Sequence, residues 1–466
     1  MPDQPNIILI TTDQQRYDSL GCTGAPLART PNLDALAADG TLFTRAYVQN
    51  PVCVPSRACI QTGRYTHQHG CHYMETVVDD TPGLPPWEAT FMEHLQAAGY
   101  VTGAVGKIHM FPPKGYDELR LTGGKGSRWT QIEGLPIGPA PLGPTYAAWL
   151  DDRHPGAYEM IYEARRRPEY REHFTAHLFP LPAEEHVDSW VAHEAVAFLR
   201  RREGGARPWF LWLGFCGPHG PFDPPQKYAD LFPIDEMPLP ETLHADLSDR
   251  AEFLRGSDRL RRDETAVRRL VAYYHAMMAH IDEMWGSVRA ELGRLGFADD
   301  TIILYTTDHG EMLGDFARTG KGVFYEPVIR DPLIAHLPGR DQPSTVDGLV
   351  EAFDLAPTVL DYAGVAIPPE MTASRSLRPH LEGGGEAGEA VLCEFTTNDR
   401  KRRGKMIRTD RYKYCFWGRE HQAEFYDLQE DPLELRNLIN DPGCAPRIDE
   451  CRSLLLDRLM ASGHRP

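Results

Sequence analysis

The sequence predicts an α/β fold, in which helices flank a large, mixed but mostly parallel β-sheet and a smaller antiparallel sheet plus helix follows at the C-terminus. Short apolar runs typical of buried strands alternate with longer segments of helical periodicity. Four of these runs are followed at once by polar residues, as expected of strands that deliver functional groups at the carboxyl edge of a parallel sheet.

The elements of the large sheet follow from these patterns. We expect strands over residues 6–12, 100–105, 209–215 and 301–305, and a further strand after residues 330–334. Helical periodicity and capping residues predict helices over residues 31–40, 91–98, 184–202, 263–295 and 355–362. Strands that alternate with helices in this way favour a parallel sheet covered on both faces.

A Gly- and Glu-rich stretch over residues 381–388 has the composition of a linker. We therefore expect a large α/β domain over residues 1–385 and an α+β subdomain over residues 386–466. Short strands are expected over residues 391–395, 406–408 and 412–416, with a closing helix over 448–460. A chain of 466 residues is long enough for such a division.

Charge and composition exclude several classes of partner. The net charge is −18, with 67 acidic against 49 basic residues, which argues against nucleic acid or an anionic membrane surface. No apolar run reaches the length of a membrane span, and no basic-then-apolar leader precedes residue 6. Nine scattered cysteines favour free thiols in a reducing compartment. We expect a cytoplasmic protein.

The segment around Cys53 is the most informative in the chain. Pro55 fits the first turn of a helix, which would place Cys53 at the helix N-terminus, where amide groups and the helix dipole favour an anion. Arg57 would lie one turn later on the same side. A nucleophile beside an anion site and a cation suits hydrolysis of a charged ester; the alternative is a buried cysteine at a helix start.

Further polar side chains follow the predicted strands, where we expect them to meet near the same sheet edge. Taken alone, each of these residues has an ordinary reading as a turn residue, a helix cap or a solvated surface group. They are Asp13 and Gln14 after the first strand, Lys107 and His109 after the second, His219 after the third, Asp308 and His309 after the fourth, and Lys321 in a Gly-Lys-Gly loop.

Two regions are harder to interpret. Residues 111–182 are rich in Gly, Pro and aromatics, and we read them as a substrate-shaping insertion that carries Trp129, Tyr146 and Trp149. Packing of these aromatics into the core is the common alternative. His275 and His280, within the long predicted helix, are expected to be packed or surface histidines rather than ligands.

The motif Cys53-Val54-Pro55-Ser56-Arg57, followed by Thr62-Gly63-Arg64, resembles the formylglycine signature of the type I sulfatases in the alkaline phosphatase superfamily. The segments 218–222, 308–314, 320–322, 407–413 and 426–432 also resemble that family in order and spacing. The resemblance implies an alkaline-phosphatase-like fold, conversion of Cys53 to formylglycine by a formylglycine-generating enzyme, and hydrolysis of a small sulfate ester.

The resemblance also implies a site for one divalent metal ion. The matching ligand positions are Asp13, Gln14, Asp308 and His309, with the modified Cys53 completing the set. Oxygen-rich ligation favours Ca²⁺, and the departures Gln14 and His309 from the commonest family pattern leave Mn²⁺ or Mg²⁺ open.

The roles implied for the remaining positions are those of a sulfate-binding and proton-transfer set. Lys107, Lys321 and Arg57 form a cationic cradle, with Arg57 mainly orienting the formylglycine hydrate. His219 is the acid for the leaving alcohol, and His109 takes the proton that lets the covalent intermediate release sulfate.

Two other functions stay open at this point. Phosphonate monoester hydrolases and phosphodiesterases of the same superfamily share the cysteine motif. A non-catalytic anion- or sugar-binding protein with an unmodified Cys53 is the more distant alternative. The sequence also leaves a homo-oligomer open.

Overall fold

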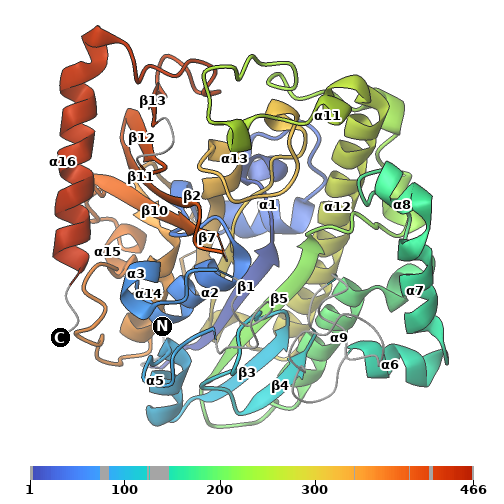
Figure 1. The fold of residues 1–466 in the computed structure, drawn as a ribbon. Coiled ribbons are helices and arrows are strands. Elements are labelled where there is room, and N and C mark those ends of the chain that lie inside the picture. Colours follow the sequence, from blue (N-terminus) through green and yellow to red (C-terminus); the bar gives the residue numbers. More distant parts are fainter. Residues whose placement is uncertain are drawn as a thin grey trace.

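The computed structural model describes residues 4–73, 83–122, 125, 146–340, 342–397, 399–418 and 423–463. A nine-stranded sheet forms the centre of the fold, and a separate four-stranded antiparallel sheet packs beside it (Figure 1). The predicted fold class is confirmed. The division of the chain at residue 385 stays a prediction, and the separate small sheet is consistent with it.

The large sheet has the strand order β4-β3-β5-β1-β6-β7-β2-β8, and β9 pairs with β2. Its strands are β1 (Asn6–Asp13), β2 (Thr41–Tyr47), β3 (Val101–Gly106), β4 (Glu118–Leu121), β5 (Trp209–Pro218), β6 (Thr301–Thr307), β7 (Arg330–His336), β8 (Ser344–Val346) and β9 (Val350–Glu351). All neighbouring pairs among these strands are parallel except those of β7, which runs antiparallel to β6 and to β2. The mixed, mostly parallel character of the sheet therefore comes from one reversed strand.

Strand β1 shows why the sheet is buried on both faces. Its residues alternate between two apolar clusters, Ile8 and Ile10 on one side and Ile7 and Leu9 on the other. Successive side chains of a strand point to opposite faces, so an unbroken apolar run buries both.

Helices α1 (Pro31–Ala38), α9 (Val187–Arg200) and α12 (Glu264–Arg294) cover the face of the sheet that carries Ile8 and Ile10. Helices α5 (Phe91–Ala97) and α14 (Leu355–Tyr362) contribute to the cluster on the opposite face. Figure 1 shows the resulting arrangement, with the sheet between two helical layers. Each of these helices was predicted, to within a few residues at its ends.

The small sheet has the order β10-β11-β12-β13, with strands β10 (Ala390–Thr396), β11 (Arg403–Thr409), β12 (Tyr412–Phe416) and β13 (Glu424–Asp427). Helix α16 (Ala445–Ser462) packs on it through Ile448, Cys451 and Leu455. The same apolar cluster contains Cys59, so the C-terminal region packs directly against the segment that follows Cys53. The backbone bond from Gly322 N–H to the Pro51 carbonyl, at 3.1 Å, joins the Lys321 loop to that segment.

The described part of the insertion over residues 111–182 is more regular than its composition indicates. It contains β4 and the helices α6 (Tyr146–Arg153), α7 (Ala157–Arg166) and α8 (Pro168–Glu172). Strand β2, which the sequence patterns did not single out, pairs with β7, β8 and β9.

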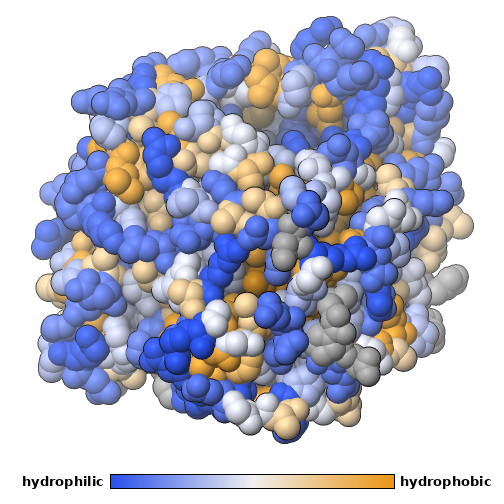
Figure 2. All heavy atoms as spheres, turned by 180° about the vertical axis from the view of Figure 1, so that it is seen from behind, coloured by the Kyte–Doolittle hydropathy of each residue, from blue (hydrophilic) through white to orange (hydrophobic). Residues whose placement is uncertain are grey.

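The face of the molecule in Figure 2 is covered mainly by hydrophilic residues, with apolar residues in small groups between them. A hydrophilic surface agrees with the 25% share of charged residues in the chain. Among the described residues, no helix combines the length and the apolar character that crossing a bilayer requires.

Candidate active site

Four adjacent parallel strands deliver the candidate site residues to one edge of the large sheet. Strands β3, β5, β1 and β6 are neighbours in that order, so their carboxyl ends lie together. Asp13 is the last residue of β1, Lys107 follows β3, His219 follows β5 and Asp308 follows β6. At Gly106 a Cβ atom would lie 2.0 Å from the carbonyl oxygen of Gly214, so only glycine fits where β3 meets β5.

Cys53 enters this group from helix α2 (Cys53–Thr62), of which it is the first residue, as the motif predicts. Its Sγ atom accepts a hydrogen bond from Lys321 Nζ at 2.6 Å and lies 3.2 Å from His309 Nε2. Asp13 Oδ1 is 4.0 Å away from the same sulfur. Residue 53 is thus the point where the strand ends, α2 and the Lys321 loop meet.

The thiol of Cys53 is held in its neutral form. Burial, and then the neighbouring carboxylate of Asp13, raise the pKa of Cys53 to about 11 against the opposing charge of Lys321. The thiolate is the nucleophilic form of cysteine, so the unmodified residue is a poor nucleophile at neutral pH.

Four buried side chains could hold a metal ion. Asp13, Cys53, Asp308 and His309 each offer one ligand atom, and these atoms all lie within 4.8 Å of one another. Gln14 is also buried, and its Oε1 atom has no hydrogen-bond partner among the described residues. A buried acceptor without a donor is costly, and a cation would satisfy it. The residues present therefore fit a divalent ion with mainly oxygen ligands.

Arg57 lies behind the two carboxylates rather than beside Cys53 alone. Its Nε donates to Asp308 Oδ2 at 2.7 Å, and its Nη2 is 3.2 Å from Asp13 Oδ2. A third bond, from Nη1 to the Lys107 carbonyl at 2.8 Å, ties it to the end of β3. All of its charge is buried and paired. Arg57 therefore positions both carboxylates, a wider role than the orientation of the hydrate that the resemblance implied.

The carboxylate of Asp13 interacts with several cationic groups of the site. Lys107 Nζ lies 2.5 Å from Asp13 Oδ2, and His219 Nε2 lies 3.8 Å from Asp13 Oδ1. Burial alone would raise the pKa of Asp13, but these two groups, with Lys321 and Arg57, hold it well below its usual range. These cations therefore favour the carboxylate form of Asp13, the form that metal binding requires.

The three histidines of the site lie among cations, with His109 and His309 buried and His219 partly exposed. Burial, and then the charge of Lys107, lower the pKa of His109 well below its ordinary value. Burial and Lys321 lower the pKa of His219 in the same way and that of His309 to about 4. All three imidazoles are therefore neutral near pH 7, and a neutral imidazole nitrogen is the form that binds a metal.

Glu311 belongs to the site, and the sequence patterns assigned it no role. Its side chain is fully buried and accepts hydrogen bonds from Gln14 Nε2, from Leu313 N–H at 3.1 Å and from Gly320 N–H. Glu311 thus connects the side chain of Gln14 to the loop that carries Lys321. The sequence feature that could have identified Glu311 is its place in the Asp308-His309-Gly310-Glu311 motif, two residues after His309.

Several other candidates lie away from this group. Tyr146 is buried in the core on α6, where its hydroxyl donates to the Glu185 carbonyl at 2.7 Å, and Trp149 is partly buried against the same core. The prediction that Tyr146 shapes the substrate site is wrong, because its ring is packed in the hydrophobic core. Trp129 lies outside the described residues.

His275 and His280 are packed, as expected. His280 Nε2 is 2.8 Å from Ser189 Oγ, and its ring stacks on Tyr228 with centroids 4.5 Å apart. His275 stacks on Phe232 with centroids 6.1 Å apart.

Comparison with known proteins assigns the chain to a family. The family model described as sulfatase matches residues 5–365, and the model described as N-sulphoglucosamine sulphohydrolase, C-terminal, matches residues 314–460. An arylsulfatase of Clostridium perfringens is 31% identical, over 98% of this chain and 94% of its own length. A choline-sulfatase of Rhizobium meliloti is 29% identical, over 94% of this chain and 83% of its own length.

Solved structures agree in fold. The phosphonate monoester hydrolase of Agrobacterium radiobacter superposes with a TM-score of 0.80 at 24% identity, covering 98% of this chain and 96% of that one. A protein solved with its substrate D-glucosamine-2-N,6-O-disulfate superposes with a TM-score of 0.78 at 22% identity, covering 99% and 98%. From the family match, and from an arylsulfatase relative that spans nearly the whole chain, we conclude that this protein is an enzyme of the sulfatase family, within the alkaline phosphatase superfamily.

Proposed function

We propose that the protein hydrolyses a small sulfate monoester, with residue 53 in its formylglycine form as the nucleophile and one divalent metal ion beside it. The observation that carries the proposal is the position of Cys53 Sγ, 2.6 Å from Lys321 Nζ and 3.2 Å from His309 Nε2 at a buried set of candidate ligands. The thiol stands where the hydrated aldehyde would be. Conversion of Cys53 requires a formylglycine-generating enzyme as a partner.

The metal would be held by Asp13, Gln14, Asp308 and His309, together with residue 53. When bound, it supplies positive charge that binds a sulfate oxygen and favours the ionised nucleophile at neutral pH. Ca²⁺ is our first expectation because most of these ligand atoms are oxygens, and Mn²⁺ and Mg²⁺ are the alternatives.

The other residues bind the sulfate group and move protons. Lys321 and Lys107 place two ammonium groups at the sulfate position, and Arg57 fixes the carboxylates beneath it. His219 gives a proton to the oxygen of the leaving alcohol. His109 takes a proton from the second hydroxyl of the hydrated residue 53, so that the aldehyde reforms and sulfate leaves.

The acid role of His219 depends on the substrate. Burial and the charge of Lys321 lower its pKa, which disfavours the protonated form. A sulfate ester bound beside Lys321 brings a negative charge that offsets this cation. The pKa of His219 then rises toward its ordinary value, so substrate binding favours the protonated form of His219 that can donate a proton.

A comparison of esters tests the proposal. We expect kcat/KM for 4-nitrophenyl sulfate to exceed that for bis(4-nitrophenyl) phosphate and for a phenylphosphonate monoester, after loading with each metal in turn. Mass spectrometry of the peptide that contains residue 53, from protein matured with its modifying enzyme, should show the aldehyde. An intact thiol in active protein would contradict the nucleophile, and a preference for the phosphorus esters would contradict the substrate class.

A further inference from the structure

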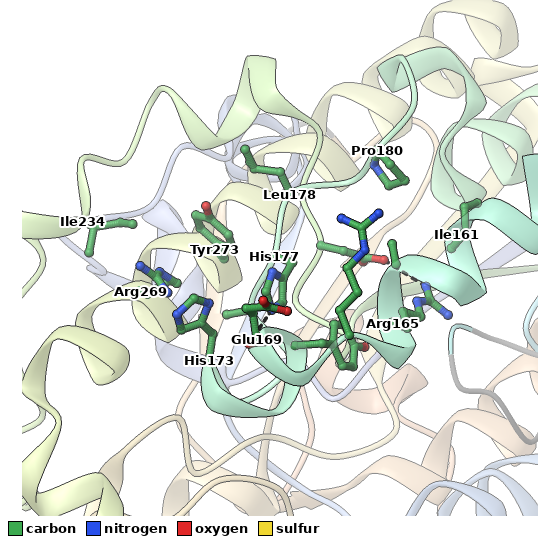
Figure 3. A pocket seen from close by; sticks show the side chains of 15 residues that line it. Ile161, Arg165, Glu169, His173, His177, Leu178, Pro180, Ile234, Arg269 and Tyr273 are labelled. Carbon is green, nitrogen blue, oxygen red and sulfur yellow. Dashed lines mark hydrogen bonds and ion pairs between the residues drawn. The ribbon is translucent and has the colours of Figure 1, made fainter.

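A cavity of about 530 Å³ lies outside the catalytic group, between α7, α8 and α12 (Figure 3). Its volume is that of a site for a small organic ligand. Three arginines line it, namely Arg165, Arg167 and Arg269, together with His173 and His177. We call this space the arginine cavity. Such a group of cations is unexpected on a chain whose net charge is −18.

Two of the three arginines have unused hydrogen-bonding capacity. The guanidinium groups of Arg167 and Arg269 make no hydrogen bond or ion pair with another residue in the part of the chain that the structure describes. Arg165 differs, because its Nη2 lies 3.0 Å from Asp223 Oδ2. Two carboxylates also line the cavity, Asp223 and Glu169. Asp223 is paired with Lys125 as well as with Arg165. The negative charge of Glu169 would repel an anion bound in the cavity.

The rest of the lining suits a ring that carries an anionic group. Apolar side chains such as Ile161 and Ile234 line the cavity together with the ring of Tyr273. His173 and His177 face each other with ring centroids 5.1 Å apart, and His177 stacks on Tyr170 at 5.2 Å. Figure 3 shows Arg269, His173 and Tyr273 along one side of the cavity. Guanidinium groups recognise sulfate and carboxylate through paired N–H donors.

One wall of the cavity is bonded to the loop that carries His219. Backbone bonds join Phe222 N–H to the Thr175 carbonyl at 2.9 Å and His177 N–H to the Phe222 carbonyl at 3.0 Å. Ala176, between these two residues, lines the cavity, as does Asp223, four residues after His219. A ligand that orders this wall therefore acts on the backbone next to His219.

We propose that the arginine cavity is a second binding site, for an organic sulfate or carboxylate carried on a ring, and that its occupancy influences His219 through residues 220–223. The anion is either the far end of a larger substrate or a separate molecule of the same chemistry. Binding itself does not depend on the chemistry at residue 53, whereas the influence on His219 rests on the proposed function.

Titration calorimetry with naphthalene-2-sulfonate tests binding without turnover, because a sulfonate is not an ester. We expect Arg167→Gln and Arg269→Gln each to weaken binding about five- to tenfold. Glu169→Gln should strengthen it about twofold, because the opposing charge is gone. Arg447→Gln, on the distant helix α16, removes the same charge and should leave the affinity unchanged. Unaltered melting temperatures show that all four variants fold.

Lys321→Ala separates this site from the catalytic pocket. The probe should still bind to Lys321→Ala with its affinity for the cavity intact. Binding that is lost in Lys321→Ala and kept in Arg269→Gln would place the probe in the catalytic pocket and overturn the proposal. Equal affinity in wild type, Arg167→Gln and Arg269→Gln would also overturn it.

Kinetics distinguish the two sources of the anion. If the cavity takes the far end of a substrate, Arg269→Gln lowers kcat/KM for a disulfated aryl ester and leaves 4-nitrophenyl sulfate unaffected. If it takes a separate molecule, naphthalene-2-sulfonate changes kcat for 4-nitrophenyl sulfate in wild type and not in Arg269→Gln. Binding without either effect would overturn the influence on His219. Wild type that hydrolyses no sulfate ester would count against the proposed function alone, since the titration still reports on the site.

Discussion

In the catalytic pocket the three cationic side chains each contact a carboxylate or the Cys53 sulfur, whereas two guanidiniums of the arginine cavity have no such partner among the described residues. Arg57 spans Asp13 and Asp308, Lys107 contacts Asp13, and Lys321 contacts Cys53. Arg167 and Arg269, by contrast, make no such contact with any residue that the structure describes. The first region is held by a sheet edge, and the second by α7 and α8 of the insertion together with α12.

This difference follows from burial. A charge taken fully out of water needs a partner, so the buried Arg57 and Lys107 are fixed in place by the same carboxylates that would hold the metal. Arginines at an open cavity keep their hydration and can exchange it for a ligand. The pairing in the pocket suits chemistry that needs fixed positions, and the unpaired arginines suit recognition of varied molecules.

The largest effect is expected from the loss of Cys53, the proposed nucleophile, which lies outside the arginine cavity. Cys53→Ala should lower kcat for 4-nitrophenyl sulfate by about four orders of magnitude or more, because it removes the nucleophile. Cys53→Ser should fail too, since one hydroxyl cannot both form the sulfate ester and expel it. Cys59→Ala, six residues further along α2, is the control and should keep its activity. Near-native turnover by Cys53→Ser would contradict the formylglycine mechanism.

The next effect tests the paired carboxylates. Asp308→Ala should lose metal and at least about 100-fold in activity, because it removes a charged ligand and leaves Arg57 without its closest partner. Gln14→Ala removes a neutral ligand, so excess metal should restore part of its activity. Metal analysis after dialysis measures the difference. Equal retention of metal by the two variants would contradict the assigned ligands.

Most of the site could be predicted because it lies where strands end. An apolar run followed by Asp13-Gln14 or Asp308-His309 is visible in sequence, and parallel strands bring such ends to one edge. The cysteine motif added α2, whose first residue is Cys53 as expected. These residues could be predicted from their position just after a strand, together with the rule that parallel strands end at the same edge of a sheet.

The parts that were missed depend on tertiary contacts. Strand β2 lies between β7 and β8, and its partners are about 300 residues away in sequence. Helix α7 carries an amphipathic pattern, with Ala157 and Ile161 buried, but the Gly-, Pro- and aromatic-rich composition of the surrounding stretch obscured it. Helix α8 has five residues and is too short for its pattern to identify it. The hydrogen bond from Gln14 to Glu311 joins two segments that no local signal connects.

A smaller effect is expected from Glu311→Gln, which tests a residue that acts only through others. The new amide nitrogen would face Gln14 Nε2, donor against donor, so the ligand oxygen of Gln14 should lose its orientation. We expect metal affinity to fall about 10- to 100-fold, the usual range for residues that support a ligand. Glu424→Gln, a buried carboxylate of the small sheet, is the control and should bind metal normally. A change in melting temperature with no change in metal affinity would make Glu311 merely structural.

The smallest expected effect compares three carboxylates on neighbouring strands. Asp13, Asp308 and Asp331 are all fully buried, but both oxygens of Asp331 have no hydrogen-bond partner among the described residues. Burial, and then the charge of Asp308, raise the pKa of Asp331 well above its ordinary value, whereas the pKa of Asp13 is lowered. Of these three carboxylates, Asp331 is therefore the one for which no described residue offsets the cost of burying its charge.

Because its pKa is raised in the folded state, Asp331 contributes stability that is fully present below the unfolded pKa near 3.8 and is lost as pH rises through the folded value. The loss is about 1.4 kcal/mol per pH unit within that window. Asp331→Asn keeps the shape and removes the titration, so the free energy of unfolding of the metal-free variant should match that of wild type at pH 4 and exceed it at pH 8, by about 1.4 kcal/mol for each pH unit between the unfolded and the folded pKa. Urea unfolding at both pH values measures this. An identical pH dependence in the two proteins would mean that a partner compensates Asp331, and the contrast with Asp13 would then disappear.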